Sequence, residues 1–229
     1  DSKEKSSQRM HDMSEILFRA SSVARLMTEP KTKSDGLLSV GAKTYIEELA
    51  AQEIFGVDFI VSSKAMEKGI ECEGDSIALL NKARGLSLIK NTERKSNEFI
   101  TGECDLFDEQ SRRGHDIKTS WSIATFPLNE KNAIDKTYEW QVRCYMALWD
   151  ADEWEVNYCL VDTPDRLISY EPMQLHVVSH LPEWMRVTTW TVKRDAEKEA
   201  AIFEKVKHAN DYFRQVIEEF DQTHKPNTQ

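Results

Sequence analysis

Two aspartates and a lysine lie close enough in the chain to form a hydrolytic site. Polar and apolar residues alternate on both sides of a polar turn in residues 98–120, the period expected of strands. This pattern predicts a β-hairpin that carries Asp105 on its first strand and Asp116 and Lys118 on one face of its second, with Ile117 turned to the core. Neighbouring carboxylates repel, and Mg²⁺, held by one or two carboxylates, waters and substrate phosphate, would remove that repulsion.

The acid-x-lysine triplet has little meaning by itself. It occurs four times, at residues 1–3, 29–31, 93–95 and 116–118, and charged surface strands produce it by chance. Only the fourth copy has an apolar residue at its centre, a strand pattern around it and an acid-bearing strand before it. The context of Asp116 and Lys118 therefore favours a site.

A third acid is expected on a helix spanning about residues 63–84. Met66, Ile70, Ile77 and Leu80 form one apolar stripe, and Glu73 falls within it at helical spacing, whereas Glu71 does not. A glutamate on a buried face needs a partner, and a metal ion or its bound water would serve. The alternative is that the helix is turned by one residue, which makes Glu73 a rim residue.

A phosphate seat is expected near the beginning of the chain. Residues 16–27 place Ser21 and Ser22 where a helix would begin, with Arg19 just before them. Free N–H groups, hydroxyls and an arginine suit a phosphate group. The alternative is that a serine only caps the helix and that Arg19 is solvated.

The remaining pattern predicts a single mixed α/β domain. We expect a helix over residues 39–55 ending at Gly56, another over 138–149 with Gln141 and Tyr145 on one face, a strand over 153–162 and a long amphipathic helix over 192–220. His176 and His180 have the spacing of a zinc pair, but no third ligand is evident, so a solvated loop is the better interpretation.

Composition sets the boundaries of the interpretation. With 229 residues the chain fits one large domain, and we assign 1–12 to a disordered arm and 13–225 to the domain. The four cysteines are scattered singly and are expected to be reduced core residues. No apolar stretch approaches the roughly 20 residues of a membrane span, and no leader pattern is visible, so we expect an intracellular protein. The net charge of −10 argues against nonspecific coating of nucleic acid, although a nuclease can confine its basic residues to one channel.

The motifs, taken in their order along the chain, resemble those of the PD-(D/E)XK nucleases, and specifically the phage-type alkaline exonucleases similar to lambda exonuclease. The resemblance runs from about Phe18 to Phe220. Its elements are Arg19-Ala20-Ser21-Ser22, Gly69-x-x-x-Glu73, Gly102-Glu103-Cys104-Asp105, Asp116-Ile117-Lys118-Thr119-Ser120 and Gln141-x-x-x-Tyr145. The first aspartate motif departs from the family pattern, because it lacks its proline.

The resemblance implies a restriction-endonuclease-like core, with a central mixed sheet flanked by helices, and a metal-dependent deoxyribonuclease. Asp105, Asp116 and the carbonyl of Ile117 would hold one Mg²⁺, and Glu73 would help to hold a second ion or a bound water. Lys118 would orient or deprotonate the attacking water, and Gln141 would position the phosphate or Lys118. Mn²⁺ would be able to replace Mg²⁺.

The implied substrate is the end of linear duplex DNA. Arg19, Ser21, Ser22 and Ser120 would hold the 5′-phosphate, and Trp121 and Tyr145 would add further DNA contacts. Family members degrade the 5′ strand in the 5′→3′ direction and deliver the 3′ overhang to a single-strand annealing protein for recombination. A homotrimeric ring, encoded by a phage or prophage and working in the cytoplasm of the bacterial host, would be expected.

Other functions are compatible with the same core. A restriction- or repair-type endonuclease would share it, although no separate recognition domain is evident. Relatives with an iron–sulfur cluster need a cysteine quartet, which the four scattered positions do not resemble. A non-catalytic DNA-binding subunit on a decayed nuclease fold is the alternative of a different class, and the intact set of acids and lysine argues against it.

Overall fold

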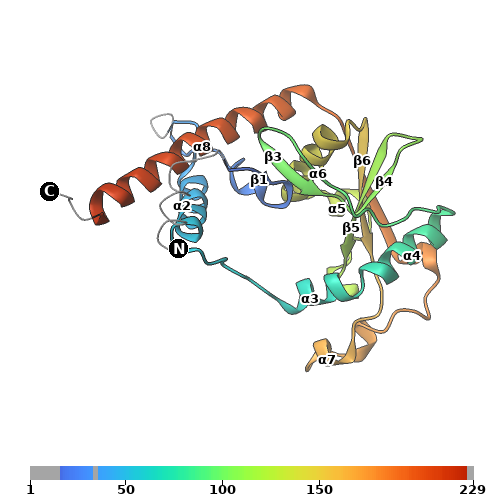
Figure 1. The fold of residues 1–229 in the computed structure, drawn as a ribbon. Helices are drawn as coiled ribbons and strands as arrows, with labels where there is room; N and C mark the ends of the chain where they lie inside the picture. Colours follow the sequence, from blue (N-terminus) through green and yellow to red (C-terminus); the bar gives the residue numbers. More distant parts are fainter. Residues whose placement is uncertain (1–15, 33–35, 226–229) are drawn as a thin grey trace.

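The fold is built on two small sheets with helices around them. The structure is a computed structural model and describes residues 16–32 and 36–225, so the arm expected at 1–12 lies outside the described residues. A three-stranded sheet has the order β1-β3-β2 and a four-stranded sheet the order β4-β5-β6-β7 (Figure 1). Helices flank both sheets, as the predicted fold class requires.

The four-stranded sheet is mixed. It contains β4 (Leu106–Asp108), β5 (Arg113–Thr119), β6 (Glu153–Cys159) and β7 (Val187–Lys193). The β4–β5 and β6–β7 pairs are antiparallel, whereas β5 and β6 are parallel and are joined through α6 (Lys136–Trp149). A parallel pair needs such a crossover, which is why a helix that bears potential site residues lies against the sheet.

Two glycines, one in each sheet, allow aromatic rings to pack closely on the strands. A Cβ at Gly114 in β5 would lie 2.2 Å from the indole of Trp154. One at Gly102 in β3 (Ile100–Glu103) would lie 2.8 Å from the ring of Tyr145. Neither position has room for a side chain. Aromatic side chains of β6 and α6 therefore pack directly on strand backbone.

The predicted first strand of the hairpin is divided between the two sheets. β3 (Ile100–Glu103) pairs with β1 (Phe18–Arg19) and β2 (Arg94–Ser96), whereas β4 pairs with β5. Asp105 lies at the break. Its carbonyl accepts from the N–H of Asn91 at 2.7 Å, and the Asn91 amide donates to the carbonyl of Cys104 at 3.0 Å. At this point the strand backbone is therefore hydrogen-bonded to Asn91 and not to a neighbouring strand of either sheet. The expectation of one continuous first strand was wrong.

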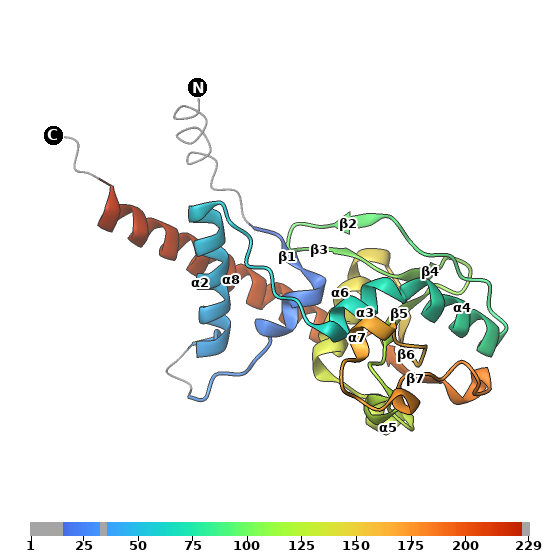
Figure 2. The same cartoon turned by 90° about the horizontal axis from the view of Figure 1, so that it is seen from below.

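Two long helices pack against each other next to the three-stranded sheet. α2 (Val40–Phe55) has the expected cap, because Ser39 accepts from the N–H of Ala42, and it ends at the left-handed Gly56. α8 (Ala196–His224) crosses α2 and packs against it (Figures 1 and 2). The predicted helix began at 192, but Val192 belongs to β7, a strand that the sequence pattern did not reveal.

The predicted helix over residues 63–84 is two helices. α3 (Lys64–Glu71) and α4 (Glu73–Arg84) meet at Cys72, whose backbone leaves the helical region at ψ 12°. The apolar stripe also fails on α3, since Met66 is 51% exposed and Ile70 is 80% exposed. The side chain of α3 that is buried instead is Lys68.

The cysteine and histidine expectations had different outcomes. Cys72, Cys104, Cys144 and Cys159 are all buried free thiols, as expected. His176 is fully buried between Thr163 and Glu171 rather than solvated, because both of its ring nitrogens have partners at 3.0 and 3.1 Å. His180 is exposed. No helix in the described residues is long and apolar enough to cross a membrane.

Candidate active site

Asp105 and Asp116 meet at the open edge of β5. β4 pairs with β5 only as far as His115, and beyond that point the Asp105 carboxylate accepts from the N–H of Ile117 at 2.6 Å. The N–H and C=O of one strand residue point to the same side, so the Ile117 carbonyl projects to this edge as well. Two carboxylates and a carbonyl oxygen therefore share one edge.

The negative charges of Asp105 and Asp116 at this edge are not fully neutralised by nearby positive groups of the protein. Asp116 is 1% exposed. Burial and, next, the negative charge of Asp116 raise the pKa of Asp105 to about 7. Such a shift means that ionised Asp105 is costly in the protein alone. A cation at the edge would offset that cost.

Lys118 lies on the same face of β5 as Asp116, as the alternation predicted. Its ammonium is 2.8 Å from Oδ2 of Asp116, 3.3 Å from Oε1 of Gln141 and 4.1 Å from the centre of the Tyr138 ring. Burial would lower the pKa of Lys118, but the carboxylates of Asp116 and Asp105 outweigh it and the net shift is upward. Lys118 is therefore a cation in this arrangement.

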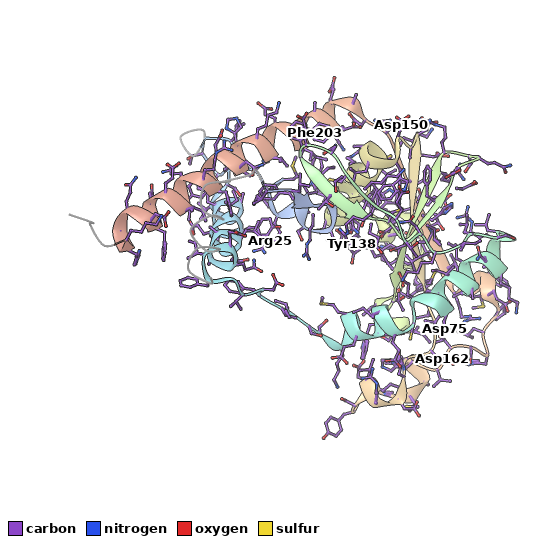
Figure 3. The ribbon with its side chains drawn as sticks, viewed as in Figure 1. Arg25, Asp75, Tyr138, Asp150, Asp162 and Phe203 are labelled. Carbon is purple, nitrogen blue, oxygen red and sulfur yellow. The ribbon has the colours of Figure 1, made fainter. Side chains whose placement is uncertain are left out.

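Gln141 joins the strand to α6. Its amide nitrogen donates to Oδ1 of Asp116 at 3.4 Å and to the hydroxyl of Tyr145 at 3.1 Å. The shared face of Gln141 and Tyr145, expected from their spacing of four residues, is thus observed. Figure 3 shows Tyr138, at the beginning of the same helix, near the centre of the molecule.

Glu73 is close enough to Asp105 for their carboxylates to interact electrostatically, whereas Glu71 is paired elsewhere. The negative charge of Glu73 contributes to the raised pKa of Asp105, and its carboxylate forms an ion pair with Lys90. Glu71 is instead ion-paired with Arg166 in α7 (Asp165–Ile168). The geometry favours Glu73 as the helix-borne acid.

The donor set fits a hard divalent cation. Oδ2 of Asp116 is buried, and its cationic neighbour among the described residues is the ammonium of Lys118, 2.8 Å away, which it shares with the charge of Asp105. In the described residues, no three histidine, cysteine or acidic side chains already converge on one point. Two carboxylates and a carbonyl leave most of the coordination shell to water and substrate, as is usual for Mg²⁺.

A small cavity lies on the other side of Tyr145. It has a volume of about 130 Å³, and its wall is formed by Arg19, Ala20, Ser21, Arg94, Thr101, Gly102, Glu103 and Tyr145. Tyr145 lines this cavity, and its hydroxyl accepts from the Gln141 amide, so one side chain links the cavity to the residues around Asp116. Two guanidinium groups and a hydroxyl around this volume suit an anion.

The helix expected at this cavity is shorter than predicted. Arg19 ends β1, and a six-residue 3₁₀ helix, Ala20–Arg25, follows. No side chain caps this helix, so the serines are not caps. Ser21 lines the cavity, whereas Ser22 faces the hydroxyl of Tyr45.

Arg94 is a cavity residue that sequence reasoning missed. It stands opposite Glu103 in the β2–β3 ladder, and its guanidinium is 3.2 Å from that carboxylate. β2 has only three residues, which is too short for a recognisable alternation. The basic pair Arg94-Lys95 was the available signal.

Ser120 and Trp121 belong to a different cluster. They follow β5, and the indole N–H of Trp121 donates to Glu171 at 3.0 Å while its ring packs edge-on against His176. The hydroxyl of Ser120 is buried and, among the described residues, has no hydrogen-bond partner. Neither residue lines the cavity, so the structure does not bring Ser120 together with Arg19 and Ser21.

Comparison with solved structures places this geometry in a family. A phage-related exonuclease from Haemophilus somnus 129PT is 36% identical, with a TM-score of 0.86 over 92% of this chain and 99% of that chain. The alkaline exonuclease LHK-Exo from Laribacter hongkongensis is 20% identical, with a TM-score of 0.64 over 90% of this chain and 92% of that chain. Its complex with dAMP gives a TM-score of 0.66. No protein-family model matches the sequence, and no curated protein matches it.

The similarity to LHK-Exo, at 20% identity, shows a shared fold only. The family assignment rests on the Haemophilus protein, which is 36% identical over nearly the full length of both chains. Over that length, the cavity and the carboxylate edge lie on the elements that the resemblance named. This chain belongs to the phage-related exonucleases, nucleases similar to lambda exonuclease.

Proposed function

We propose that the protein is a Mg²⁺-dependent exonuclease that degrades the 5′ strand of linear duplex DNA in the 5′→3′ direction. The observation that carries this proposal is the pairing of two unlike sites on α6. One site is the edge of β5, where the charges of Asp105 and Asp116 are not fully neutralised by the protein. The other is the cavity lined by Arg19 and Arg94, which Tyr145 links to Gln141. A terminal phosphate in the cavity would place the next phosphodiester near the carboxylates.

The chain's own residues have separate roles in this hydrolysis. Asp105, Asp116 and the carbonyl of Ile117 would hold Mg²⁺, and Glu73 would hold a second ion or its water after leaving Lys90. When bound, the metal would supply Lewis-acid activation of the scissile phosphate. Lys118, as a cation, orients the attacking water, and Gln141 holds both Lys118 and Asp116 in place. Mn²⁺ would be able to substitute for Mg²⁺.

The cavity would select the end of the strand. Arg19 and Arg94 can each make charge-assisted bonds to phosphate oxygens, and the Ser21 hydroxyl adds a donor. LHK-Exo binds dAMP in its solved complex, which supports a mononucleotide product here. The resulting 3′ overhang would pass to a single-strand annealing protein in phage recombination, in the cytoplasm of the bacterial host.

A ring-shaped homotrimer is proposed as the working form. The stretch between α2 and α3 exposes four large apolar side chains to solvent, with Val57 56% exposed, Phe59 55%, Ile60 87% and Val61 77%. Apolar stretches of this kind are typical of interfaces. Analytical ultracentrifugation at micromolar concentration should give three times the chain mass, and a monomer with and without DNA would contradict the ring.

The test uses linear duplex DNA labelled at either the 5′ or the 3′ end. With Mg²⁺, label at the 5′ end should be released first as mononucleotide, and a chelator should stop the reaction. Covalently closed circular duplex is the control and should stay intact. Cutting of the circle would indicate an endonuclease, and binding without any cleavage would indicate a non-catalytic subunit.

A further inference from the structure

α3 is held to the rest of the molecule by a buried lysine. The ammonium of Lys68 donates to three backbone carbonyls, those of Ser120 at 2.7 Å, Val161 at 2.9 Å and Trp121 at 3.0 Å. These carbonyls lie just past the ends of the parallel strands β5 and β6. No carboxylate of the described residues forms an ion pair with Lys68, although its side chain is 0% exposed.

This arrangement matches the lysine's hydrogen-bonding capacity. An ammonium has three donors and no acceptor, and a buried charge is tolerated only when such groups are satisfied. Burial lowers the pKa of Lys68 to about 8, although the negative charge of Asp162 opposes this shift. The position is therefore built for an ammonium and would be poorly filled by an apolar side chain.

The apolar face of a typical helix is missing from α3. Among its eight residues, all of which the structure describes, Lys68 alone is buried. Met66 and Ile70 are exposed, and a Cβ at Gly69 would meet nothing within 4 Å. The location of α3 thus depends on polar contacts rather than on hydrophobic packing. The buried contact is that of Lys68, and exposed ion pairs join Glu67 and Glu71 to Arg166.

The same helix leads directly to the helix-borne acid. Glu73 begins α4 immediately after Cys72, whose thiol is 3.7 Å from the carbonyl of Asp162, and Ser76 is 2.8 Å from the hydroxyl of Thr119. Figure 3 marks Asp75 and Asp162, which show where α4 meets the chain after β6. These contacts attach the α3–α4 junction to the ends of the strands, of which β5 carries Asp116 and Lys118.

We propose that Lys68 is a positioning residue, which fixes Glu73 relative to Asp105 and Asp116 by tying α3 to the carbonyl ends of β5 and β6. This inference rests on the proposed metal-dependent nuclease activity. Glu73 has a competing partner in Lys90, so its approach to the metal depends on where the start of α4 is held. Lys68 touches neither substrate nor metal.

The test compares Lys68→Met, which removes the donors and keeps an unbranched stem, with Lys64→Met on the exposed side of α3. Three quantities should be measured on the full-length protein: kcat, KM for duplex ends, and the Mg²⁺ concentration giving half-maximal activity. Loss of a residue that orients metal ligands typically lowers metal affinity about 10- to 100-fold. We expect Lys68→Met to raise the half-maximal Mg²⁺ concentration by about tenfold or more and to lower kcat at limiting Mg²⁺, with KM nearly unchanged. Lys64→Met should match the wild type.

A second readout does not need activity. Mg²⁺ should raise the Tm of the wild type in the absence of DNA, and this rise should shrink in Lys68→Met. A folded Lys68→Met with unchanged Mg²⁺ dependence in both assays would overturn the inference and leave the nuclease proposal intact. An inactive wild type that still shows the difference in Tm shift would overturn the nuclease proposal alone.

Lys68→Arg covers the case in which Lys68→Met does not fold. Arginine keeps the charge and the donors, but its planar group cannot occupy the same three-carbonyl site. We expect it to fold and to raise the half-maximal Mg²⁺ concentration in the same direction. Wild-type Mg²⁺ dependence in Lys68→Arg would overturn the positioning role.

Discussion

Two buried acid clusters occupy opposite faces of the same pair of strands. Asp116 and Lys118 lie on one face of β5, whereas His115 lies on the other and is paired in register with Glu155 of β6. Two guanidinium groups, those of Arg84 and Arg113, contact Glu155, and the ring of His115 is 3.1 Å away. The Asp116 face has Lys118 as its cation and a second carboxylate, Asp105, beside it.

The direction of the pKa shifts reflects this difference. Burial would raise the pKa of Glu155, but its contacts with His115 and Arg84 outweigh burial and lower it to about 2. The pKa of Asp105 moves upward instead, to about 7. A buried carboxylate that the protein neutralises stabilises the fold, whereas one left underneutralised is available to a cation from outside.

The largest expected effect comes from the underneutralised face. Asp116→Asn and Lys118→Ala should each lower kcat by about 10³-fold or more, because the groups of one catalytic unit fail together. Their circular dichroism spectra should match that of the wild type, and calorimetry should show weakened Mg²⁺ binding for Asp116→Asn. Nuclease activity near the wild-type level in Asp116→Asn would show that the Asp116 face is no more important for catalysis than the Glu155 face.

The neutralised face should respond in stability instead. Glu155→Gln removes the anion that Arg84 and Arg113 share, although Arg113 keeps its ion pair with Glu153. Because both arginines are partly exposed, the expected loss is about 2 kcal/mol, below the cost of breaking a fully buried pair. Urea unfolding should show this loss, while the folded variant keeps the Mg²⁺ dependence of the wild type.

The pH dependence sharpens the Glu155 prediction. The native pKa of Glu155, about 2, is below its ordinary value of 4.5, so its contribution to stability is present above about pH 4.5 and is lost as the pH falls through about 2. The difference in unfolding free energy between wild type and Glu155→Gln should therefore shrink on acidification. A constant difference from pH 7 to pH 2 would contradict the assignment.

The ion pair of Arg94 with Glu103 lies outside the core, and its expected effect is intermediate between those of the Asp116 and Glu155 faces. Arg94 faces Glu103 as Arg84 faces Glu155, but Arg94 lines a cavity and its side chain is 55% exposed. Arg94→Ala and Arg19→Ala should each slow digestion of 5′-phosphorylated ends by about 10- to 100-fold, the range for one lost charged hydrogen bond. Ends that carry a 5′-hydroxyl should be nearly unaffected.

The control for this measurement is Arg112→Ala, since Arg112 is ion-paired with Asp150 and Asp152 and does not line the cavity. It should digest both kinds of end at wild-type rates. Equal losses on both ends in Arg19→Ala and Arg94→Ala would mean that these residues contact the DNA backbone generally or have structural roles.

The smallest expected effect is a change in metal-free stability. The native pKa of Asp105, about 7, exceeds its ordinary value of 3.8, so the metal-free protein loses stability as the pH rises between these values. Asp105→Asn should raise the metal-free Tm at pH 8, by roughly 2–4 °C for each kcal/mol gained, and the gain should shrink towards pH 4. Mg²⁺ should raise the Tm of the wild type and leave that of the variant unchanged. A Tm gain in Asp105→Asn that is equal at pH 8 and pH 4 would count against the raised pKa.

Local patterns in the sequence determined the elements whose neighbours are close in the chain. The alternation across Asp116-Ile117-Lys118 correctly predicted which side chains share a face of β5. The spacing of Gln141 and Tyr145 correctly predicted their contact on α6, and Ser39 and Gly56 predicted the ends of α2. Periodicity and capping depend on residues within a turn or two, so one sequence is enough to recognise them.

The tertiary structure alone decided the features that depend on distant residues. Asn91 binds the backbone where the expected strand breaks, next to Asp105, and β2 brings Arg94 into a cavity with Arg19. Carbonyls from two strand ends make Lys68 rather than Met66 the buried residue of α3. Hydrophobicity predicts burial only when the surroundings are apolar. Where backbone carbonyls or opposite charges from remote segments satisfy a polar group, that group can be the buried one, and no local pattern records where those partners will be.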